Sequence, residues 1–423
     1  MLNGKRANFF PCLSAIAAVF FLVVLSETVS SQPKSINDYL AAARHYNSSL
    51  IDYQNQLASL SFDSSKINAS FLPKVNFISQ AMIAPSIGSF GYDNAITNGG
   101  NYSAQIAASQ ELLQGGNRDL QLAKLNTQRQ SIATTLILSE RDLVKNITSQ
   151  YVAAYSDLNT AQATEENLRL IDEQVQLLKE FVSKGIYSQS DYLTLLIARN
   201  QQEIALLQAR TQYRTNLYKL NLLAGISDST TVTLGDPQLG SNPAIPLYQS
   251  LRARQFTLDS LSIEYDRSLL DWTYKPKFGW FADAGLNTSD PRNVYHNLGF
   301  SVGLNLSIPI YDGGQRFFEY EKFNLAHNTI AAKARIFFLE TNIQRMMLSE
   351  QLRAQDSLIS QYRKQLESIN ELISFQKQQL RQGNLKINDL LLTFNTLNTT
   401  RASMRQAEIS RSQTIIELNY LNQ

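Results

Sequence analysis

The stretch from 300 to 316 constrains the fold most, because it joins the pattern of a membrane strand to that of a long helix. From Phe300 to Ile310 every second residue is large and apolar, and those between are mostly small or polar. This alternation predicts a strand with one apolar face, and its eleven residues suit a tilted bilayer-crossing strand. Gly313 and Gly314 then predict a sharp turn into a helical pattern of about seventy residues.

The same strand, turn and helix occur earlier in the chain. Alternating residues 102–112 precede Gly115 and Gly116, which we expect to form a strand-to-helix turn like that at Gly313, 198 residues further on. Further pairs at this spacing are Gly185 and Gly383, Asp191 and Asp389, Leu193 and Leu391, and Ala209 and Ala407. A spacing held without slippage indicates an internal duplication.

The domain organisation follows from this duplication. Residues 225–245 are rich in Gly, Pro, Ser and Asp and predict a linker, so the structural repeats are expected at 32–224 and 246–423. Each repeat would contain a first helix, two strands and a long helical hairpin. The first helix of the first repeat is expected over 36–70 as one continuous element.

Residues 1–31 have the pattern of a secretory signal peptide. Lys5 and Arg6 give the positive start, and Leu13 to Leu25 form an apolar run too short to span a membrane. Cys12, the only cysteine, precedes this run, so it cannot be the acylated cysteine of a lipoprotein signal. We therefore expect a mature chain without a disulfide, a thiolate metal site or that kind of lipid anchor.

Composition and motifs argue against several classes of function. The 38 basic and 36 acidic residues nearly balance, which disfavours a nucleic-acid binder. The three histidines are isolated, and the sequence lacks G-x-S-x-G, a phosphate loop and H-E-x-x-H, so we expect neither an enzyme nor a metal or cofactor site. Beyond the signal, no run of eighteen apolar residues predicts a membrane helix, so any crossing must be by strands.

Four strands are expected, near 75–83, 102–112, 278–286 and 300–310. Four strands cannot close a barrel, since about eight is the practical minimum, and open edges in lipid would leave backbone groups unpaired at several kcal/mol each. Oligomerisation is therefore expected.

Four motifs resemble those of the TolC-type outer-membrane efflux proteins. They are E-L-L-Q-G-G-N-R at 111–118, F-V-S-K-G-I-Y-S-Q-S-D-Y-L at 181–193, P-I-Y-D-G-G-Q-R at 309–316 and R-Q-G-N-L-K-I-N-D-L-L at 381–391. Each is weak alone, but together they are specific and cover essentially the whole mature chain. The resemblance implies a mainly α-helical homotrimer whose chains each give four strands to a twelve-stranded β-barrel, continued by a periplasmic barrel of coiled-coil hairpins.

The resemblance also implies a function. Such a trimer is the passive exit duct of a tripartite efflux or type I secretion system, lies in the outer membrane of a diderm bacterium and extends into the periplasm. It receives cargo from an inner-membrane pump of the RND, ABC or MFS type through a periplasmic adaptor protein. The alternative is that the chain is itself a periplasmic coiled-coil adaptor, which would need compact β-rich modules flanking one hairpin rather than two hairpins and lipid-facing strands.

The resemblance assigns the adaptor-binding tips to the two breaks in the long helices. The candidate residues are Gly185, Ile186, Tyr187, Ser188, Gly383, Asn384 and Leu385. A local alternative is that Gly185 and Gly383 are ordinary helix stops that supply a positive φ.

The resemblance also places a periplasmic gate on the hairpins. The candidate gate residues are Asp191, Leu385, Asp389 and Leu392. The family often carries two aspartates three residues apart on the second hairpin, and here only Asp389 matches, with Leu392 in the second place. Leu385 stands where an arginine often locks the closed mouth, so we expect apolar contact to contribute to closure.

Asp191 also has a local explanation, because Ser188 and Asp191 have the spacing of a capping box at a helix start. Position 386 in the second repeat is Lys, so no such box accounts for Asp389.

Overall fold

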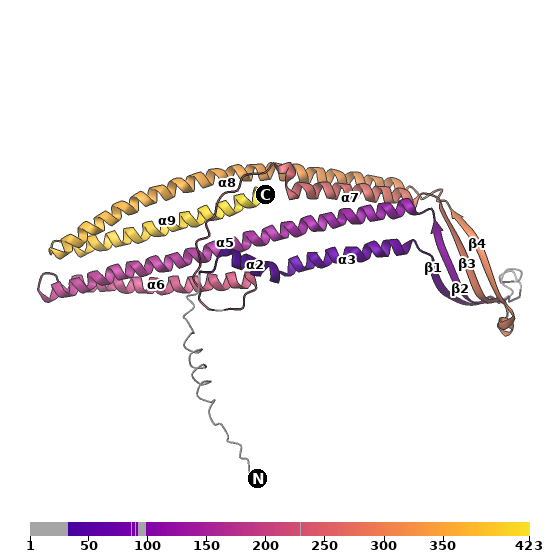
Figure 1. Ribbon diagram of the computed structural model, residues 1–423, viewed down its shortest axis with the longest axis horizontal. Helices are drawn as coiled ribbons and strands as arrows, with labels where there is room; N and C mark the ends of the chain where they lie inside the picture. The colour runs from indigo at the N-terminus through magenta and orange to yellow at the C-terminus, as the bar shows by residue number, and fades with distance from the viewer. Residues whose placement is uncertain (1–32, 86, 89, 92–98, 229) are drawn as a thin grey trace, which may run out of the picture. The chain divides into compact units, whose positions relative to one another are not determined.

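A computed structural model describes residues 33–85, 87–88, 90–91, 99–228 and 230–423; the expected signal peptide at 1–31 lies outside them. The elements are α2 (Ile36–Tyr46), α3 (Ser48–Ser70), β1 (Lys74–Ile83), β2 (Gly100–Leu112), α5 (Gly115–Ser183), α6 (Gln189–Ala224), α7 (Leu251–Thr273), β3 (Lys277–Thr288), β4 (Leu298–Ser307), α8 (Gln315–Arg381) and α9 (Ile387–Leu421), with short 3₁₀ turns at Leu247–Gln249 and Pro291–His296 (Figure 1). Among these described residues, no helix combines the length and apolar character needed to span a membrane.

The chain divides into two compact units. We call one the hairpin unit, which contains the described residues up to 47 together with 143–242 and 348–420, and the other the sheet unit, which contains 48–142, 243–347 and 421–423. The divisions fall inside α5 and α8, so each unit takes segments from both sequence repeats. Helix lengths agree between the repeats, with 69 residues in α5 against 67 in α8, and 36 in α6 against 35 in α9.

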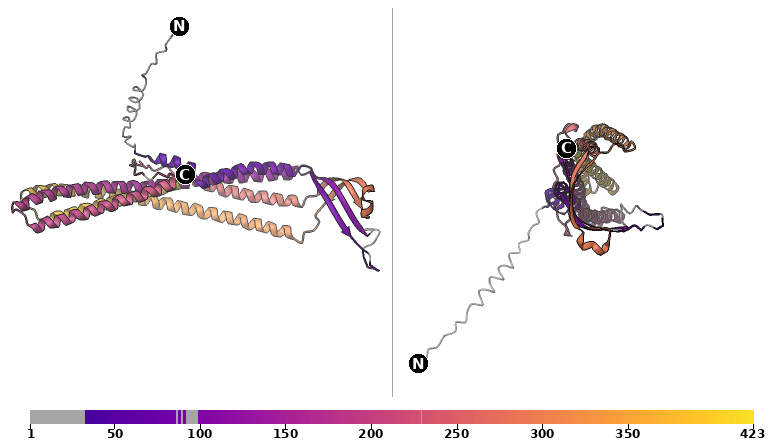
Figure 2. Two further views of the ribbon diagram at one scale, coloured as in Figure 1. Left: turned by 90° about the horizontal axis from the view of Figure 1, so that it is seen from below. Right: turned by 90° about the vertical axis from the view of Figure 1, so that its right-hand side faces the viewer.

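The strands of the sheet unit lie side by side in one antiparallel layer, in the order β1-β2-β3-β4 (Figures 1 and 2). The register places Phe77 opposite Ile106, Ile106 opposite Ala284, and Ala284 opposite Phe300. Directly opposed residues of antiparallel strands point to the same face. One face of the sheet is therefore apolar across all the strands.

This apolar face is uncovered within the chain. Phe77 is 71% exposed and Phe300 is 84% exposed. The opposite face carries Gln105, Asp283 and Ser301, and the Ser301 hydroxyl donates a hydrogen bond to Asp283. The predicted one-sided strands are confirmed. An apolar face left open over four strands marks a surface for contact with a membrane or another protein.

Two expected elements differ in extent from the structure. The fourth strand ends at Ser307 rather than Ile310, because Pro309 lacks the N–H that a ladder needs. The helix expected over 36–70 is two helices, α2 and α3, separated at Asn47, whose φ of −72° and ψ of 114° are extended. Gly225, at the end of α6, packs against Tyr46 so closely that a Cβ there would lie 2.6 Å from the Tyr46 Cβ. The break between α2 and α3 is therefore accompanied by tertiary packing, which the helical periodicity of the sequence does not predict.

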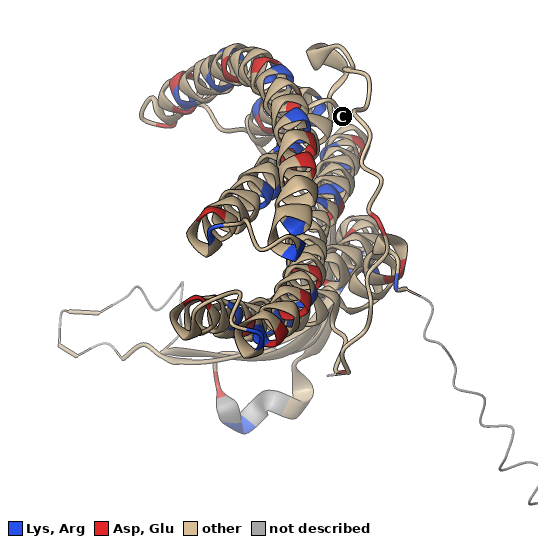
Figure 3. Ribbon diagram, turned by 90° about the vertical axis from the view of Figure 1, so that its left-hand side faces the viewer, with Lys and Arg blue, Asp and Glu red and all other residues tan. Residues whose placement is uncertain are grey.

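The core of the hairpin unit is a cluster of buried apolar residues from α5, α6, α8, α9 and the turn between α8 and α9. Its members are Ile171, Val175, Leu178, Leu195, Ile369, Ile373, Leu380, Leu385, Ile387, Leu390, Phe394 and Leu397. Ile171, Val175 and Leu178 follow one another on α5 at intervals of three or four residues, as in a coiled coil. Charged residues of both signs are spread along the helices (Figure 3), as the near-neutral composition predicts.

Candidate functional site

Both hairpin turns lie in the hairpin unit, and each begins with a left-handed glycine. Gly185 has a φ of 74° and Gly383 a φ of 76°. The amide of Ile186 donates to the Phe181 carbonyl at 2.9 Å, and the amide of Asn384 donates to the carbonyl five residues before it at 3.0 Å. These are the bonds of a Schellman helix end, where glycine avoids the strain of a positive φ. Each glycine is thus a helix stop and also the start of a hairpin turn.

Tyr187 joins the two turns. The sequence predicts this residue at a hairpin tip but does not predict its partner. The Tyr187 hydroxyl lies 3.1 Å from the Leu385 carbonyl oxygen, to which it donates, and 3.2 Å from the Leu385 amide, from which it accepts. The ring stacks on Phe181 with centroids 6.1 Å apart. Burial raises the pKa of Tyr187. Tyr187 and Leu385 are equivalent positions of the two repeats, so this contact binds one hairpin tip to the other.

The remaining tip residues differ in what surrounds them. A Cβ added at Gly383 would lie 3.0 Å from Ile186 Cγ2, whereas one added at Gly185 would meet nothing within 4 Å. Ile186 is half exposed, and Ser188 and Asn384 are also exposed. The first tip therefore offers open surface, while the second tip packs on the first.

The structure confirms the local explanation of Asp191. The Ser188 hydroxyl donates to the Asp191 carboxylate at 2.6 Å and accepts from the Asp191 amide at 3.1 Å, while the Ser188 amide donates to the same carboxylate at 3.2 Å. These bonds form the capping box of α6. The Asp191 carboxylate is therefore already engaged at a helix start.

The other three gate candidates do not share one environment. Leu385 is 6% exposed and belongs to the buried core cluster. Leu392 is 68% exposed, and Asp389 is also exposed in the first turn of α9. Within the described residues the Asp389 carboxylate has no hydrogen bond or ion pair. A separation of three residues puts Asp389 and Leu392 on one side of α9, so these two, rather than Leu385, are free to face another molecule.

The strand-to-helix turn of the second repeat has the expected glycine geometry. Gly313 and Gly314 have φ values of 70° and 83°. The Asp312 carboxylate accepts hydrogen bonds from the amides of Gly314 and Arg316, each at 2.8 Å, and from the Tyr274 hydroxyl at 2.6 Å. The carboxylate thus caps the start of α8 and fixes the turn.

The first repeat differs from the expected turn at Gly115 and Gly116. Both residues are already helical, at the start of α5, and the positive φ of 60° falls on Leu113 instead. Gly116 serves close packing, since a Cβ there would lie 2.3 Å from the Trp272 ring. The glycine pair of the second repeat therefore provides positive φ values, whereas Gly116 of the first repeat makes room for the Trp272 ring.

No protein-family model and no curated protein sequence matches this chain. Solved structures do match it. CusC, whose crystal structures concern transmembrane channel formation, aligns with a TM-score of 0.73 at 12% identity over 92% of each chain. The outer membrane protein VceC of Vibrio cholerae aligns with a TM-score of 0.74 at 11% identity over 92% of this chain and 96% of its own. The CmeC outer membrane channel of Campylobacter jejuni aligns with a TM-score of 0.72 at 12% identity over 91% of this chain and 85% of its own.

The chain has the fold of these outer-membrane channels. The predicted fold class, mostly helical with four antiparallel strands and paired long helices, is confirmed.

The contact between the tips gives a direct prediction. Tyr187→Phe removes the hydroxyl from the Leu385 backbone and should weaken the pairing of the turns by about 1 kcal/mol, so that the Leu385 amide exchanges roughly fivefold faster with deuterium. Hydrogen exchange measured by mass spectrometry would report this. Tyr192→Phe, on a partly buried tyrosine of the same cluster, is the control and should leave the exchange unchanged. Equal exchange in Tyr187→Phe and the wild type would show that the hydroxyl does not hold the tips together.

Proposed function

We propose that this chain is one subunit of a homotrimeric outer-membrane channel. The observation that supports this best is the sheet, which has an exposed apolar face, a polar face and two unpaired edges, β1 and β4. Strand directions alternate along the sheet, so β4 of one copy can pair antiparallel with β1 of the next. Three copies would close a twelve-stranded barrel with its apolar face toward lipid and its polar face toward a water-filled lumen.

The helices would form the periplasmic part of the same duct. In this proposal the channel is passive and is the exit duct of a tripartite efflux or type I secretion system. An inner-membrane pump would deliver its cargo through a periplasmic adaptor. The similarity of the whole chain to outer-membrane channels supports this role.

The hairpin turns are the proposed adaptor-binding tips. Gly185 and Ile186 offer an open, partly apolar turn, and Gly383 packs directly behind Ile186. An adaptor that binds the first tip would therefore also act on the second, because the Tyr187 hydroxyl ties the two backbones together.

An exposed seam on α6 supports assembly in the helical region as well. Its apolar residues are separated by 3, 4, 7 or 11 positions, so they lie on one side of the helix. This is the pattern of a coiled-coil helix without its partner. They are Leu193, Ile197, Ile204, Leu207, Tyr218 and Leu222, and all are between 45% and 80% exposed.

The internal duplication suggests a partner for this seam. Within one chain, Leu177 and Leu391 pack on the same core cluster, and their repeat equivalents, Phe375 and Leu193, are 64% and 47% exposed. The α5–α9 contact is therefore satisfied inside the chain, while the equivalent α8–α6 contact is open. We propose that α6 of one subunit packs on α8 of the next, as α9 packs on α5.

This packing predicts a specific contact between subunits. Asn167 on α5 donates to Asn398 on α9 at 2.6 Å, and the equivalents of these residues are Gln365 on α8 and Asn200 on α6. In the double variant Asn200→Cys, Gln365→Cys, a short thiol-specific crosslinker should give covalent dimers and trimers on a denaturing gel. The mature chain offers no competing thiol, because the single cysteine lies in the expected signal peptide.

The matched control pairs Asn200→Cys with Glu367→Cys, since two residues along α8 turn the side chain to the opposite face. This control should remain monomeric on the gel. Crosslinking of both pairs to the same extent, or of neither, would contradict the proposed α6–α8 contact.

The trimer would place three copies of Asp389 around one axis. Exposed carboxylates that face one another across a pore attract cations, and the neighbouring exposed Leu392 can add an apolar constriction. Asp389→Asn should reduce the cation preference measured from reversal potentials in a salt gradient across a planar bilayer. Leu392→Ser should raise the open probability.

Asp191→Asn is the control for Asp389. Its carboxylate caps α6, so this change should weaken the helix start without altering ion selectivity. If Asp389→Asn leaves the reversal potential unchanged, Asp389 is only a favourable charge at the start of α9.

A further inference from the structure

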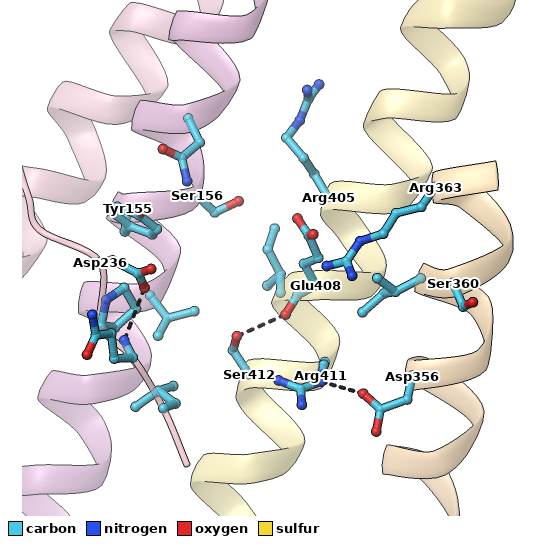
Figure 4. A pocket seen from close by; sticks show the side chains of 17 residues that line it. Tyr155, Ser156, Asp236, Asp356, Ser360, Arg363, Arg405, Glu408, Arg411 and Ser412 are labelled. Atoms are coloured by element: carbon cyan, nitrogen blue, oxygen red, sulfur yellow. Dashed lines mark hydrogen bonds and ion pairs between the residues drawn. The ribbon is translucent and has the colours of Figure 1, made fainter. Parts of the chain in front are cut away.

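Two charged side chains of α3 have no partner inside the chain. In the polar cavity of the hairpin unit, of about 610 Å³ between α5, α8, α9 and residues 236–239, three arginines are matched by three carboxylates (Figure 4). On α3, by contrast, neither the Asp63 carboxylate nor the Lys66 ammonium forms a hydrogen bond or an ion pair with any residue that the structure describes. These two charges therefore remain available to another molecule.

The equivalent helix of the second repeat, α7, shows what α3 lacks. Both helices have 23 residues, and β1 and β3 begin four residues after them, so each α3 residue corresponds to the α7 residue 203 positions later. Helix α7 contacts other helices on two sides. Its Ser260 hydroxyl lies 3.1 Å from His327 Nδ1 on α8, and its Asp266 pairs with Lys124 on α5.

One side of α3 is covered and another is open. Leu50 and Leu60 are buried. Asp52 and Lys66 are 14 residues apart, which puts them on one side of the helix, and both are exposed. The equivalent of Asp52 is Gln255, which contacts α5, so the exposed side of α3 corresponds to the side of α7 that meets α5.

The contact between α5 and α7 is polar, and the two helices are antiparallel. The Lys124 ammonium pairs with the Asp266 carboxylate, and the Gln255 amide donates to the Ser131 hydroxyl at 2.6 Å. The residue further along α5 thus meets the residue nearer the start of α7. The equivalents of these four residues are Lys322 and Thr329 on α8, and Asp63 and Asp52 on α3.

The ion pair of this contact recurs in its open equivalent. Asp63 repeats the acid of Asp266, and Lys322 repeats the base of Lys124. Lys322 bonds Glu319, one turn earlier on α8, at 2.9 Å, and its side chain is largely exposed. Because an exposed pair within one helix is worth little, Lys322 is free to engage a carboxylate of another helix.

A second pair of charges appears one turn along the same contact. At this turn α5 and α7 have the uncharged residues Gln121 and Leu269. Their equivalents on α8 and α3 are Glu319 and Lys66, which carry opposite charges. In the antiparallel arrangement these two residues would face each other, one turn away from the first pair. The exposed side of α3 is therefore complementary in charge to α8.

We propose that α3 of one subunit packs antiparallel on α8 of the next, through the pairs Asp63–Lys322 and Lys66–Glu319. This inference rests on the homotrimer proposed above, and it adds a contact in the sheet unit to the α6–α8 contact in the hairpin unit. Exposed ion pairs add little affinity. A slip of one turn, however, would bring Asp63 to Glu319 or Lys66 to Lys322, so that like charges meet. The charges therefore fix the register of neighbouring subunits.

A crosslink between positions 52 and 329 tests the contact. The equivalent residues Gln255 and Ser131 are hydrogen-bonded, so a short thiol-specific crosslinker should join the double variant Asp52→Cys, Thr329→Cys into covalent dimers and trimers on a denaturing gel. Asp52→Cys with Ala331→Cys is the matched control. It should stay monomeric on the gel, because Ala331 lines the cavity between α7 and α8, on another side of α8.

Charge exchange tests the register. In the crosslinkable double variant, Asp63→Lys with Lys66→Asp should lower the crosslinked fraction at least about threefold at low salt, because like charges then face each other. Adding Glu319→Lys and Lys322→Glu should restore the crosslinked fraction.

Native mass spectrometry of the wild type separates two ways in which this inference can fail. A wild type that is not trimeric would contradict the homotrimer and this contact with it. A trimeric wild type would leave only the α3–α8 contact to be overturned, either by absence of the crosslink between positions 52 and 329 or by a crosslinked fraction that the exchange on α3 leaves unchanged.

Discussion

The strongest constraint on this molecule comes from the unpaired backbone N–H and C=O groups at the two edges of the sheet. Each strand between β1 and β4 is paired on both sides, but β1 and β4 each present one unpaired row of N–H and C=O groups. Beside the apolar face that contains Phe77 and Phe300, those groups would have no water to bind in lipid, and each would cost several kcal/mol. In the proposed trimer, closure with further copies would remove that cost, and the helices that continue from the strands would also meet helices of the neighbouring copies.

The duplication gives one chain two equivalent sets of contact residues, of which only one is paired inside the chain. Asn167 and Asn398 meet inside the chain, whereas their equivalents Gln365 and Asn200 remain exposed on α8 and α6. In the proposed assembly, these exposed positions of one subunit meet those of the next in the way that Asn167 and Asn398 meet inside the chain. The repeats also diverge at single positions, since the Tyr187 hydroxyl donates to the backbone carbonyl of its own equivalent, Leu385.

Sequence patterns predicted the elements better than their local details. The alternation around Phe300 and the helical period after Gly314 predicted the strands and long helices, since both patterns reflect burial on one side. The same glycine spacing could not show that Gly116 makes room for Trp272 while Gly314 adopts a positive φ, because the difference comes from a distant helix. At the candidate site the hairpin turns and the Asp191 cap were predictable from local motifs. The burial of Leu385 depends on packing between hairpins, which a single sequence does not display.

The central claim is that three chains are needed to close the sheet. The most direct test is the mass of the detergent-solubilised particle, measured by native mass spectrometry after the detergent has been stripped in the gas phase. The account predicts a single species with the mass of three mature chains that also conducts ions when reconstituted in a planar bilayer. A particle of one chain that is stable and monodisperse without detergent would contradict it.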